Sequence, residues 1–259
     1  MMNQYNGKLL ELPKKGKTLV ITDIHGNLID FNKIMNIWAN FQDKNNHMII
    51  TGDFIHAMGR ENDKSIEIID SLKYHVENTG NFHILLGNHE WSVISKTTIY
   101  KGGKNLNLNF EIMLKEVFGD KWKIKLEEYI EFFKKLPLAV RTQNNVFISH
   151  AGPPKNVESI KDIVQITNKG YLNNVILFEL LWNREGDYTK EDMNSFLKKV
   201  GCNALIVGHS PVNGYKLIEK KQLVISSSYS RGKKAYIELD LEKKINNAKD
   251  LLKMVKYFN

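Results

Sequence analysis

Five short polar motifs hold the residue types in this sequence that could do chemistry. Each directly follows a short apolar run: Asp23-Ile24-His25, Gly52-Asp53, Gly87-Asn88-His89-Glu90, His150-Ala151-Gly152 and Gly208-His209-Ser210. A single histidine at the end of a strand is more often structural than a ligand, but the five motifs together form a pattern. Asp, Asn and His supply oxygen and nitrogen donors without a thiolate, a set that suits Mn, Fe or Zn. The motifs therefore predict a metal site.

A site for two metals needs a ligand that reaches both ions, which lie about 3.5–4 Å apart in such centres. A carboxylate such as Asp53 has two oxygens and can bridge, whereas a histidine cannot. The glycines that precede Asp53, Asn88 and His209 are expected to let the backbone turn sharply and bring each ligand inward.

The apolar runs before the motifs contain four or five residues without polar alternation, which is typical of strands buried on both faces. They are Thr18–Thr22, Met48–Thr51, Phe82–Leu86, Val146–Ser149 and Ala204–Val207. Helical spacing of apolar residues predicts one helix over Leu28–Trp38 and another over Ile66–Val76. This β-α-β-α-β order predicts parallel strands, and ligands gather at the carboxyl ends of such strands.

The rest of the chain predicts further elements of a single domain over residues 1–259, because no repeat and no Pro- or Ser-rich linker interrupts it. We expect helices over Phe110–Phe118 and Ile124–Leu136, an exposed loop over Lys101–Asn105, strands over Leu223–Ser226 and Ala235–Leu239, and a final amphipathic helix over Leu251–Val255.

The composition is that of an ordinary globular protein, with 42% hydrophobic and 25% charged residues, which excludes disordered and fibrous classes. The net charge of +8 allows an anionic partner, but the lysines are dispersed, so a nucleic-acid partner is possible and not indicated. Cys202 is the single cysteine, and no apolar run approaches 18 residues. We expect a soluble cytoplasmic protein without a membrane partner; its oligomeric state stays open.

The five motifs resemble those of calcineurin-like metallophosphoesterases. They are most similar to the phosphoprotein phosphatase branch, which includes bacterial serine/threonine phosphatases and symmetrical diadenosine tetraphosphatases. The segment from Val224 to Leu239 is similar to the closing hairpin of that branch. The resemblance implies an α/β fold, a four-layer α-β-β-α sandwich of two mixed sheets, with a dimetal site at the carboxyl ends of the strands.

The resemblance also implies a role for each motif residue. Asp23 and His25 would hold the first metal, Asp53 would bridge, and Asn88, His150 and His209 would hold the second. Two divalent ions are implied, with Mn expected and Fe or Zn as alternatives. A metal-bridging hydroxide would attack phosphorus in line. His89 would protonate the leaving oxygen, and Asn88 would also contact the substrate phosphate.

Arg184 is the expected phosphate clamp, because it follows Leu180-Leu181-Trp182-Asn183, which is similar to a Leu-Leu-Trp stretch before an active-site loop of the branch. A guanidinium can grip two phosphate oxygens at once. The alternative for Arg184 is a surface ion pair with Glu185 or Asp187.

The second motif departs from the family pattern Gly-Asp-x-x-Asp-Arg-Gly. The Asp that usually orients the catalytic histidine falls at His56, and the usual phosphate-binding Arg falls at Ala57. Arg60 would take over phosphate binding, or else lie at the surface with acidic neighbours. Two smaller departures are Thr22 for a Gly and Ser210 for a Thr.

The sequence therefore predicts a dimetal phosphatase of phosphomonoesters, with phosphoserine and phosphothreonine in proteins as substrates. The alternative is a nucleotide or dinucleoside polyphosphate phosphohydrolase. A scaffold that binds partners without chemistry is a third possibility, which the complete set of expected metal and acid residues disfavours.

Overall fold

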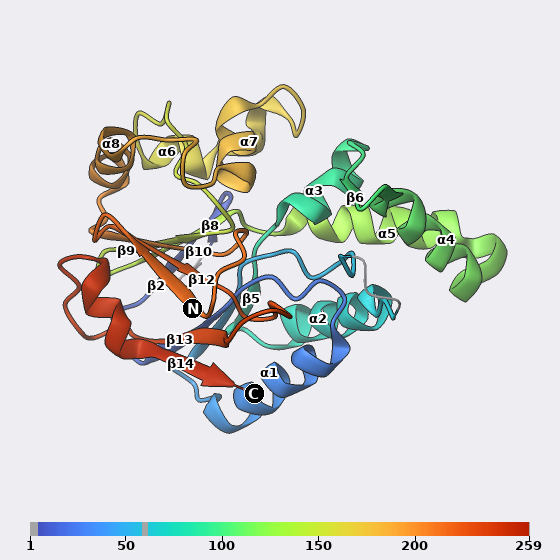
Figure 1. The fold of residues 1–259 in the computed structure, drawn as a ribbon, viewed down its shortest axis with the longest axis horizontal. Coiled ribbons are helices and arrows are strands. Elements are labelled where there is room, and N and C mark those ends of the chain that lie inside the picture. The colour runs from blue at the N-terminus through green and yellow to red at the C-terminus, as the bar shows by residue number, and fades with distance from the viewer. Residues whose placement is uncertain (1–4, 59–61, 259) are drawn as a thin grey trace.

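Two mixed β-sheets lie face to face at the centre of the computed structural model, which describes residues 5–58 and 62–258 (Figure 1). One sheet has seven strands in the order β1 (Tyr5–Asn6), β2 (Leu9–Leu12), β8 (Ala139–Thr142), β9 (Val146–Ser149), β10 (Ala204–Val207), β12 (Gln222–Ile225) and β11 (Tyr215–Ile218). The other has five in the order β14 (Val255–Phe258), β13 (Lys234–Asp240), β3 (Lys17–Ile21), β4 (His47–Ile50) and β5 (Phe82–Ile84).

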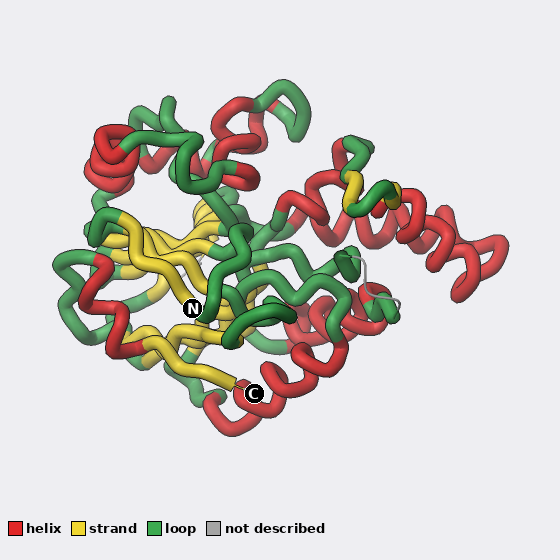
Figure 2. The backbone as a smooth tube through the Cα atoms, viewed as in Figure 1, coloured by secondary structure: helices red, strands yellow, loops and turns green. Residues whose placement is uncertain are grey.

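Helices form the outer layers on both sides of the paired sheets (Figure 2). On the five-stranded side these are α1 (Leu28–Phe41) and α2 (Ser65–Asn78). On the seven-stranded side they are α6 (Ile160–Val164), α7 (Val175–Trp182) and α8 (Lys190–Val200). At one end α3 (Asn88–Ser95), α4 (Leu106–Phe118) and α5 (Trp122–Lys135) extend away from the sheets. Short 3-10 helices cover Gly119–Lys121, Ile166–Lys169 and Ala248–Met254.

Alternate residues of the central strands belong to two different apolar cores. Val20 and Ile49 pack into the core between the sheets, together with Ile148 and Ile206 from the opposite sheet. Their neighbours Leu19, Ile21, Met48 and Ile50 pack instead into the core beneath the helices. Because successive side chains of a strand point to opposite faces, both faces are covered. The α-β-β-α sandwich and the doubly buried strands are thus confirmed.

The first three predicted strands lie side by side and parallel, as the β-α-β-α-β order predicts. Val20 pairs with Ile49, and Ile50 pairs with Ile84. The carboxyl ends of β3, β4 and β5 therefore meet at one edge of the sheet, where the first three motifs begin.

The predicted helix over Leu251–Val255 is wrong in part. Residues Ala248–Met254 form a 3-10 helix, and Val255–Phe258 form β14, which pairs antiparallel with β13. The β-branched Val255 and the aromatic Tyr257 and Phe258 favour a strand once the edge of β13 offers hydrogen bonds. The local spacing of apolar residues does not show that β13 is available as a pairing partner.

Two smaller expectations also need correction. The strands around Val224 and Leu239 form as predicted, but they lie in different sheets, so they do not make a hairpin. The stretch Lys101–Asn105 is largely exposed as expected, but it folds into a short hairpin of β6 (Tyr100–Lys101) and β7 (Lys104–Asn105). Gly102 and Gly103, both at positive φ, make its turn.

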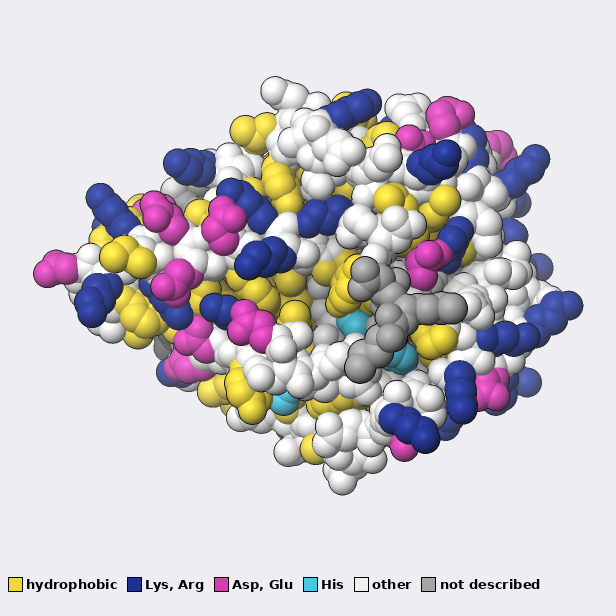
Figure 3. All heavy atoms as spheres, turned by 180° about the vertical axis from the view of Figure 1, so that it is seen from behind, with side chains coloured by type: hydrophobic (Ala, Val, Ile, Leu, Met, Phe, Trp, Pro, Cys, Tyr) yellow, Lys and Arg dark blue, Asp and Glu magenta, His cyan; other side chains and the backbone are white. Residues whose placement is uncertain are grey.

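Within the described residues, no helix is both long enough and apolar enough to cross a membrane. On the face that Figure 3 shows, lysines and arginines are spread among acidic residues rather than gathered into a stripe.

Candidate metal centre and active site

The ends of strands from both sheets bring the five motifs together. Within the five-stranded sheet, the backbone N–H groups of Ile24 and His25 donate to the carbonyl oxygen of Asp53 at 2.8 and 2.9 Å. The N–H of Gly208 donates to the carbonyl oxygen of His150 at 3.0 Å in the other sheet. Histidine side chains reach the surface near the middle of the face in Figure 3.

Two groups of side chains present donor atoms close enough to share a metal ion. One is His25, Asp53 and His89, and the other is Asp53, His150 and His209; within each group the ligand atoms lie within 4.8 Å of one another. Asp53 belongs to both groups. Its Oδ2 atom lies 3.7 Å from His25 Nε2 and 3.5 Å from His150 Nε2. This is the position that a bridging carboxylate requires.

Backbone carbonyls orient two of these histidines. His150 Nδ1 lies 2.9 Å from the carbonyl oxygen of Thr51, and His25 Nδ1 lies 3.3 Å from that of Ile55. Each contact places the ring proton on Nδ1, so the lone pair of Nε2 points into the site. Outer hydrogen bonds of this kind are usual for histidines that bind metals.

The donor spacing of the second group fits a metal ion. His150 Nε2 lies 2.9 Å from Asn88 Oδ1 and 3.1 Å from His209 Nδ1. Around a metal with bonds of about 2.1 Å, neighbouring donors stand about 3.0 Å apart in an octahedron and about 3.4 Å apart in a tetrahedron. The predicted ligands Asn88, His150 and His209 are therefore gathered as one set with Asp53.

Asp23 lies beside these groups rather than in either of them. Its two carboxylate oxygens accept the backbone N–H of His209 at 3.0 and 2.9 Å. Burial raises the pKa of Asp23. Its assignment to the first metal stays a prediction, and among the described residues His89 completes the group of His25 and Asp53 instead.

The charges of the site suit a divalent cation. Burial, followed by the negative charge of Asp23, raises the pKa of Asp53 well above its usual range. Burial lowers the pKa of His150 and that of His209, so both rings are held neutral with lone pairs available. Buried carboxylates are costly without a counter-charge, and a bound cation supplies one. The donor set fits the metals that the sequence predicts.

The glycines before the ligands have two different roles. Gly52 has φ of +102°, a conformation that only glycine adopts without strain, as expected for a sharp turn. Gly87 has an ordinary φ of −97°. A Cβ there would overlap Asp53, and a Cβ at Gly208 would overlap Asp23. The prediction that a sharp turn requires glycine is therefore wrong for Gly87 and Gly208. These two glycines instead allow the side chains of Asp53 and Asp23 to approach the backbone closely.

Several site residues that are not glycine also have positive φ. The values are 49° for His25, 53° for Asp53, 65° for His56 and 62° for His209. Such conformations cost of order 1–3 kcal/mol each and persist where the surrounding structure holds them. Their concentration at the strand ends marks this region as a functional site.

A family model described as calcineurin-like phosphoesterase matches residues 16–213, which include all five motifs. The chain belongs to this family. A probable serine/threonine-protein phosphatase of Encephalitozoon cuniculi is 24% identical over 220 residues, which cover 78% of this chain and 44% of that relative. The chain thus spans less than half the length of this curated relative.

Two solved structures show the same fold. A protein serine/threonine phosphatase from Saccharomyces cerevisiae has a TM-score of 0.66 at 20% identity, covering 90% of this chain and 76% of its own. A cold-active protein-tyrosine phosphatase of a Shewanella species has a TM-score of 0.60 at 16% identity, covering 89% of this chain and 77% of its own. The expected fold family is confirmed.

In this phosphoesterase, His89 lies in the first turn of α3 and is buried. Its backbone N–H donates to Asp53 Oδ1 at 3.0 Å, and its Nε2 atom lies 3.8 Å from Asp53 Oδ2. Its Nδ1 atom meets Nδ1 of His56 at 2.9 Å. Burial and the neighbouring imidazoles, first that of His25, hold the pKa of His89 well below its usual range.

Glu90 supports the site in a way that the sequence does not reveal. One carboxylate oxygen accepts the backbone N–H groups of Asp53 and Gly87, and the other accepts those of Phe54 and Ile55, at 2.9 to 3.2 Å. Burial and then the charge of Asp53 raise the pKa of Glu90 to about 8, while these N–H groups act in the opposite direction. In the sequence, only the position of Glu90 in the third motif could have indicated this supporting role.

Arg184 is exposed at the edge of a cavity of about 730 Å³ that also reaches His209 and Trp182. Among the described residues its guanidinium forms no ion pair. Glu185 pairs with Lys216, and Asp187 accepts the backbone N–H of Arg184 at 2.8 Å. The alternative of a surface ion pair is thus not what the structure shows. Arg60 lies outside the described residues.

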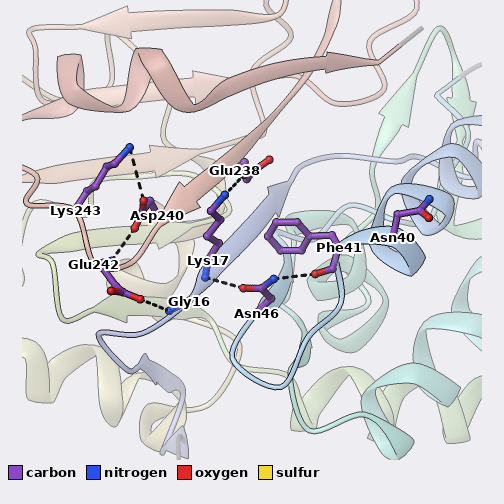
Figure 4. A pocket seen from close by; sticks show the side chains of 9 residues that line it. All are labelled: Gly16, Lys17, Asn40, Phe41, Asn46, Glu238, Asp240, Glu242 and Lys243. Carbon is purple, nitrogen blue, oxygen red and sulfur yellow. Dashed lines mark hydrogen bonds and ion pairs between the residues drawn. The ribbon is translucent and has the colours of Figure 1, made fainter.

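A second hollow, of about 580 Å³, lies at the opposite end of the five-stranded sheet (Figure 4). Lys17 Nζ lies 2.6 Å from Glu238, and Lys243 Nζ lies 3.7 Å from Asp240. Because both lysines pair with acidic neighbours and Glu242 accepts the backbone N–H of Gly16 at 3.2 Å, this hollow does not resemble a second reactive centre.

Proposed function

We propose that this chain is a metal-dependent phosphoric ester hydrolase that acts on phosphoserine and phosphothreonine in proteins. The observation that carries the proposal is that Asp53 lies in both groups of metal-binding side chains. Membership of the calcineurin-like phosphoesterase family supports the hydrolase activity. Two relatives named as serine/threonine phosphatases support the substrate class.

The metal ligands in this proposal start from the two groups of donors, with Asp23 in place of His89 in the first group and Asn88 added to the second. Asp23, His25 and Asp53 would hold one ion. Asp53, Asn88, His150 and His209 would hold the other. Mn is the proposed metal, with Fe and Zn as alternatives, because all donors are oxygen or nitrogen. Bound divalent ions would activate the attacking water and offset the charge of the phosphate oxygens.

The remaining polar side chains orient the ester and assist the leaving group. Arg184 would bind phosphate oxygens with its guanidinium, which forms no ion pair with the described residues. The side-chain amide of Asn88 would also contact the phosphate. His89 is the proposed acid, because its Nε2 atom lies 3.8 Å from Asp53 Oδ2, beside the metal-binding groups.

The shape of the cavity beside His209 favours an extended substrate. Val175 and Phe178 of α7 line it and are 60% and 49% exposed, so the cavity continues onto an open apolar surface. A peptide that carries the phosphorylated residue would lie along this wall. A nucleotide or dinucleoside polyphosphate is the alternative substrate, since Phe178 could stack a base.

The deciding experiment compares kcat/KM of Mn²⁺-loaded protein for a phosphothreonine peptide and for diadenosine tetraphosphate, with products identified chemically. We expect a preference for the peptide. A preference for the dinucleotide would replace the proposed substrate class. Absence of turnover on both and on p-nitrophenyl phosphate, with two metals bound, would favour the scaffold. The variant His89→Ala serves as the control: it should retain metal and lose roughly 10²-fold in kcat.

A further inference from the structure

The ring of His56 touches the proposed acid, His89, in an unusual way. The two Nδ1 atoms lie 2.9 Å apart, and the ring planes meet at 64°. Both side chains are buried, with 1% and 4% of their surface exposed. Two Nδ1 atoms at this distance cannot both carry a hydrogen, because the two hydrogens would collide. A hydrogen bond between the two Nδ1 atoms then requires one ring to donate and the other to accept.

Two contacts fix the position of His56, and its backbone conformation is unusual. Its backbone N–H donates to Ser65 Oγ at 2.9 Å. Its ring stands edge-to-face against Phe110 of α4, with ring centroids 5.8 Å apart. Its backbone has φ of 65°, a conformation that costs energy for a residue with a Cβ. The fold therefore holds this ring against His89 at some cost.

The other nitrogen of His56 decides the direction of the hydrogen bond. Nε2 of His56 is buried and has no hydrogen-bond partner among the described residues. If His56 accepted the hydrogen bond, its proton would sit on Nε2 as a buried N–H without an acceptor. If His56 donates, Nε2 carries only a lone pair. Buried N–H groups without a partner are rarer in proteins than acceptors without one, so donation by His56 is favoured.

We propose that His56 is a positioning residue that sets the tautomer of His89. His56 donates its Nδ1–H to Nδ1 of His89, and the single proton of His89 therefore lies on Nε2. That nitrogen is the one 3.8 Å from Asp53 Oδ2, on the side of the metal-binding groups. His89 thus presents a hydrogen-bond donor, not a lone pair, to the leaving oxygen. This inference rests on the proposed function for the role of His89, but the tautomer itself does not.

NMR of ¹⁵N-labelled protein loaded with diamagnetic Zn²⁺ tests the tautomer directly, because the couplings of ring protons to Nδ1 and Nε2 show which nitrogen carries the hydrogen. The signals of His89 are assigned by their loss in His89→Gln. We expect Nε2–H in the wild type and in His56→Asn, whose amide can still donate. In His56→Asp the partner only accepts when ionised, so His89 should carry a proton on Nδ1. Nδ1–H without Nε2–H on His89 of the wild type would overturn the proposal.

Kinetics of His56→Phe test the consequence for the reaction, because phenylalanine keeps the ring and removes the donor. We expect kcat to fall about tenfold for phenyl phosphate, whose leaving oxygen needs a donor, and to change little for 2,4-dinitrophenyl phosphate. KM and metal content should stay the same. An equal loss on both substrates would assign His56 a merely structural role. Absence of activity in every variant and in the wild type would refute the proposed function while leaving the NMR result intact.

Discussion

Replacing Gly87 by alanine tests whether the metal centre depends on close approach of two chain segments. The three atoms nearest to the new Cβ would be Asp53 Oδ1, Asp53 N and Glu90 Oε2, all under 3.0 Å, whereas ordinary contact begins at 3.4 Å. Asp53 would have to move by about 1 Å to relieve the overlap. The φ of Gly87, −97°, suits alanine, so backbone strain does not contribute.

The expected loss has two parts. Overpacking in a rigid site costs roughly 1–3 kcal/mol, which should appear in the free energy of unfolding measured with urea. A shift of about 1 Å also exceeds the tolerance of about 0.2 Å for metal–ligand distances. We therefore expect affinity for Mn²⁺, measured by calorimetry, to fall roughly 10–100-fold.

Gly80→Ala is the matched control, because no atom lies within 4 Å of its Cβ position and its φ is not in the left-handed region. It should change the free energy of unfolding by less than about 1 kcal/mol and leave metal affinity unaltered. If Gly87→Ala behaved like Gly80→Ala in both measurements, the contact between Gly87 and Asp53 would not be a structural requirement.

Three further predictions concern the proposed bridging ligand Asp53, the proposed phosphate-binding residue Arg184 and the stability of the protein at acid pH. Asp53→Asn should lower the content of both metals together in elemental analysis; loss of one metal alone would contradict a bridging role. Arg184→Lys should lower kcat/KM for phosphate esters by roughly tenfold with metal content unchanged, since a lysine cannot grip two oxygens; unchanged kinetics would remove it from the phosphate site. Burial lowers the pKa of His47 to about 4 and that of His83 to about 3. Below pH 6.5 these two histidines therefore become protonated in the unfolded chain, while they stay neutral in the folded chain. The free energy of unfolding of metal-loaded protein should fall with pH by up to about 1.4 kcal/mol per unit for each of these histidines between pH 6.5 and about 4. This slope should be smaller in His47→Phe, and an identical slope would contradict the argument.

The residue types of the metal site were readable from the sequence. Apolar runs without alternation predict strands buried on both faces, and the residues after each run predict oxygen and nitrogen ligands. Both inferences need only local information, because side-chain period and donor chemistry belong to the residues themselves. Asp53, Asn88, His150 and His209 accordingly meet where the motifs place them.

Contacts between distant segments were decided by the tertiary structure alone. The backbone N–H of His209 donates to the carboxylate of Asp23, 186 residues away. The carboxylate of Glu90 accepts backbone N–H groups at the end of another strand. β14 exists because β13 offers an unpaired edge, which no local pattern around Val255 records. The direction of the hydrogen bond between His56 and His89 likewise depends on His56 Nε2, which is buried and has no partner within the described part of the chain. The sequence by itself determined which donors are present. The tertiary structure decided how they are spaced and protonated, because both depend on desolvation and on neighbours that only folding supplies.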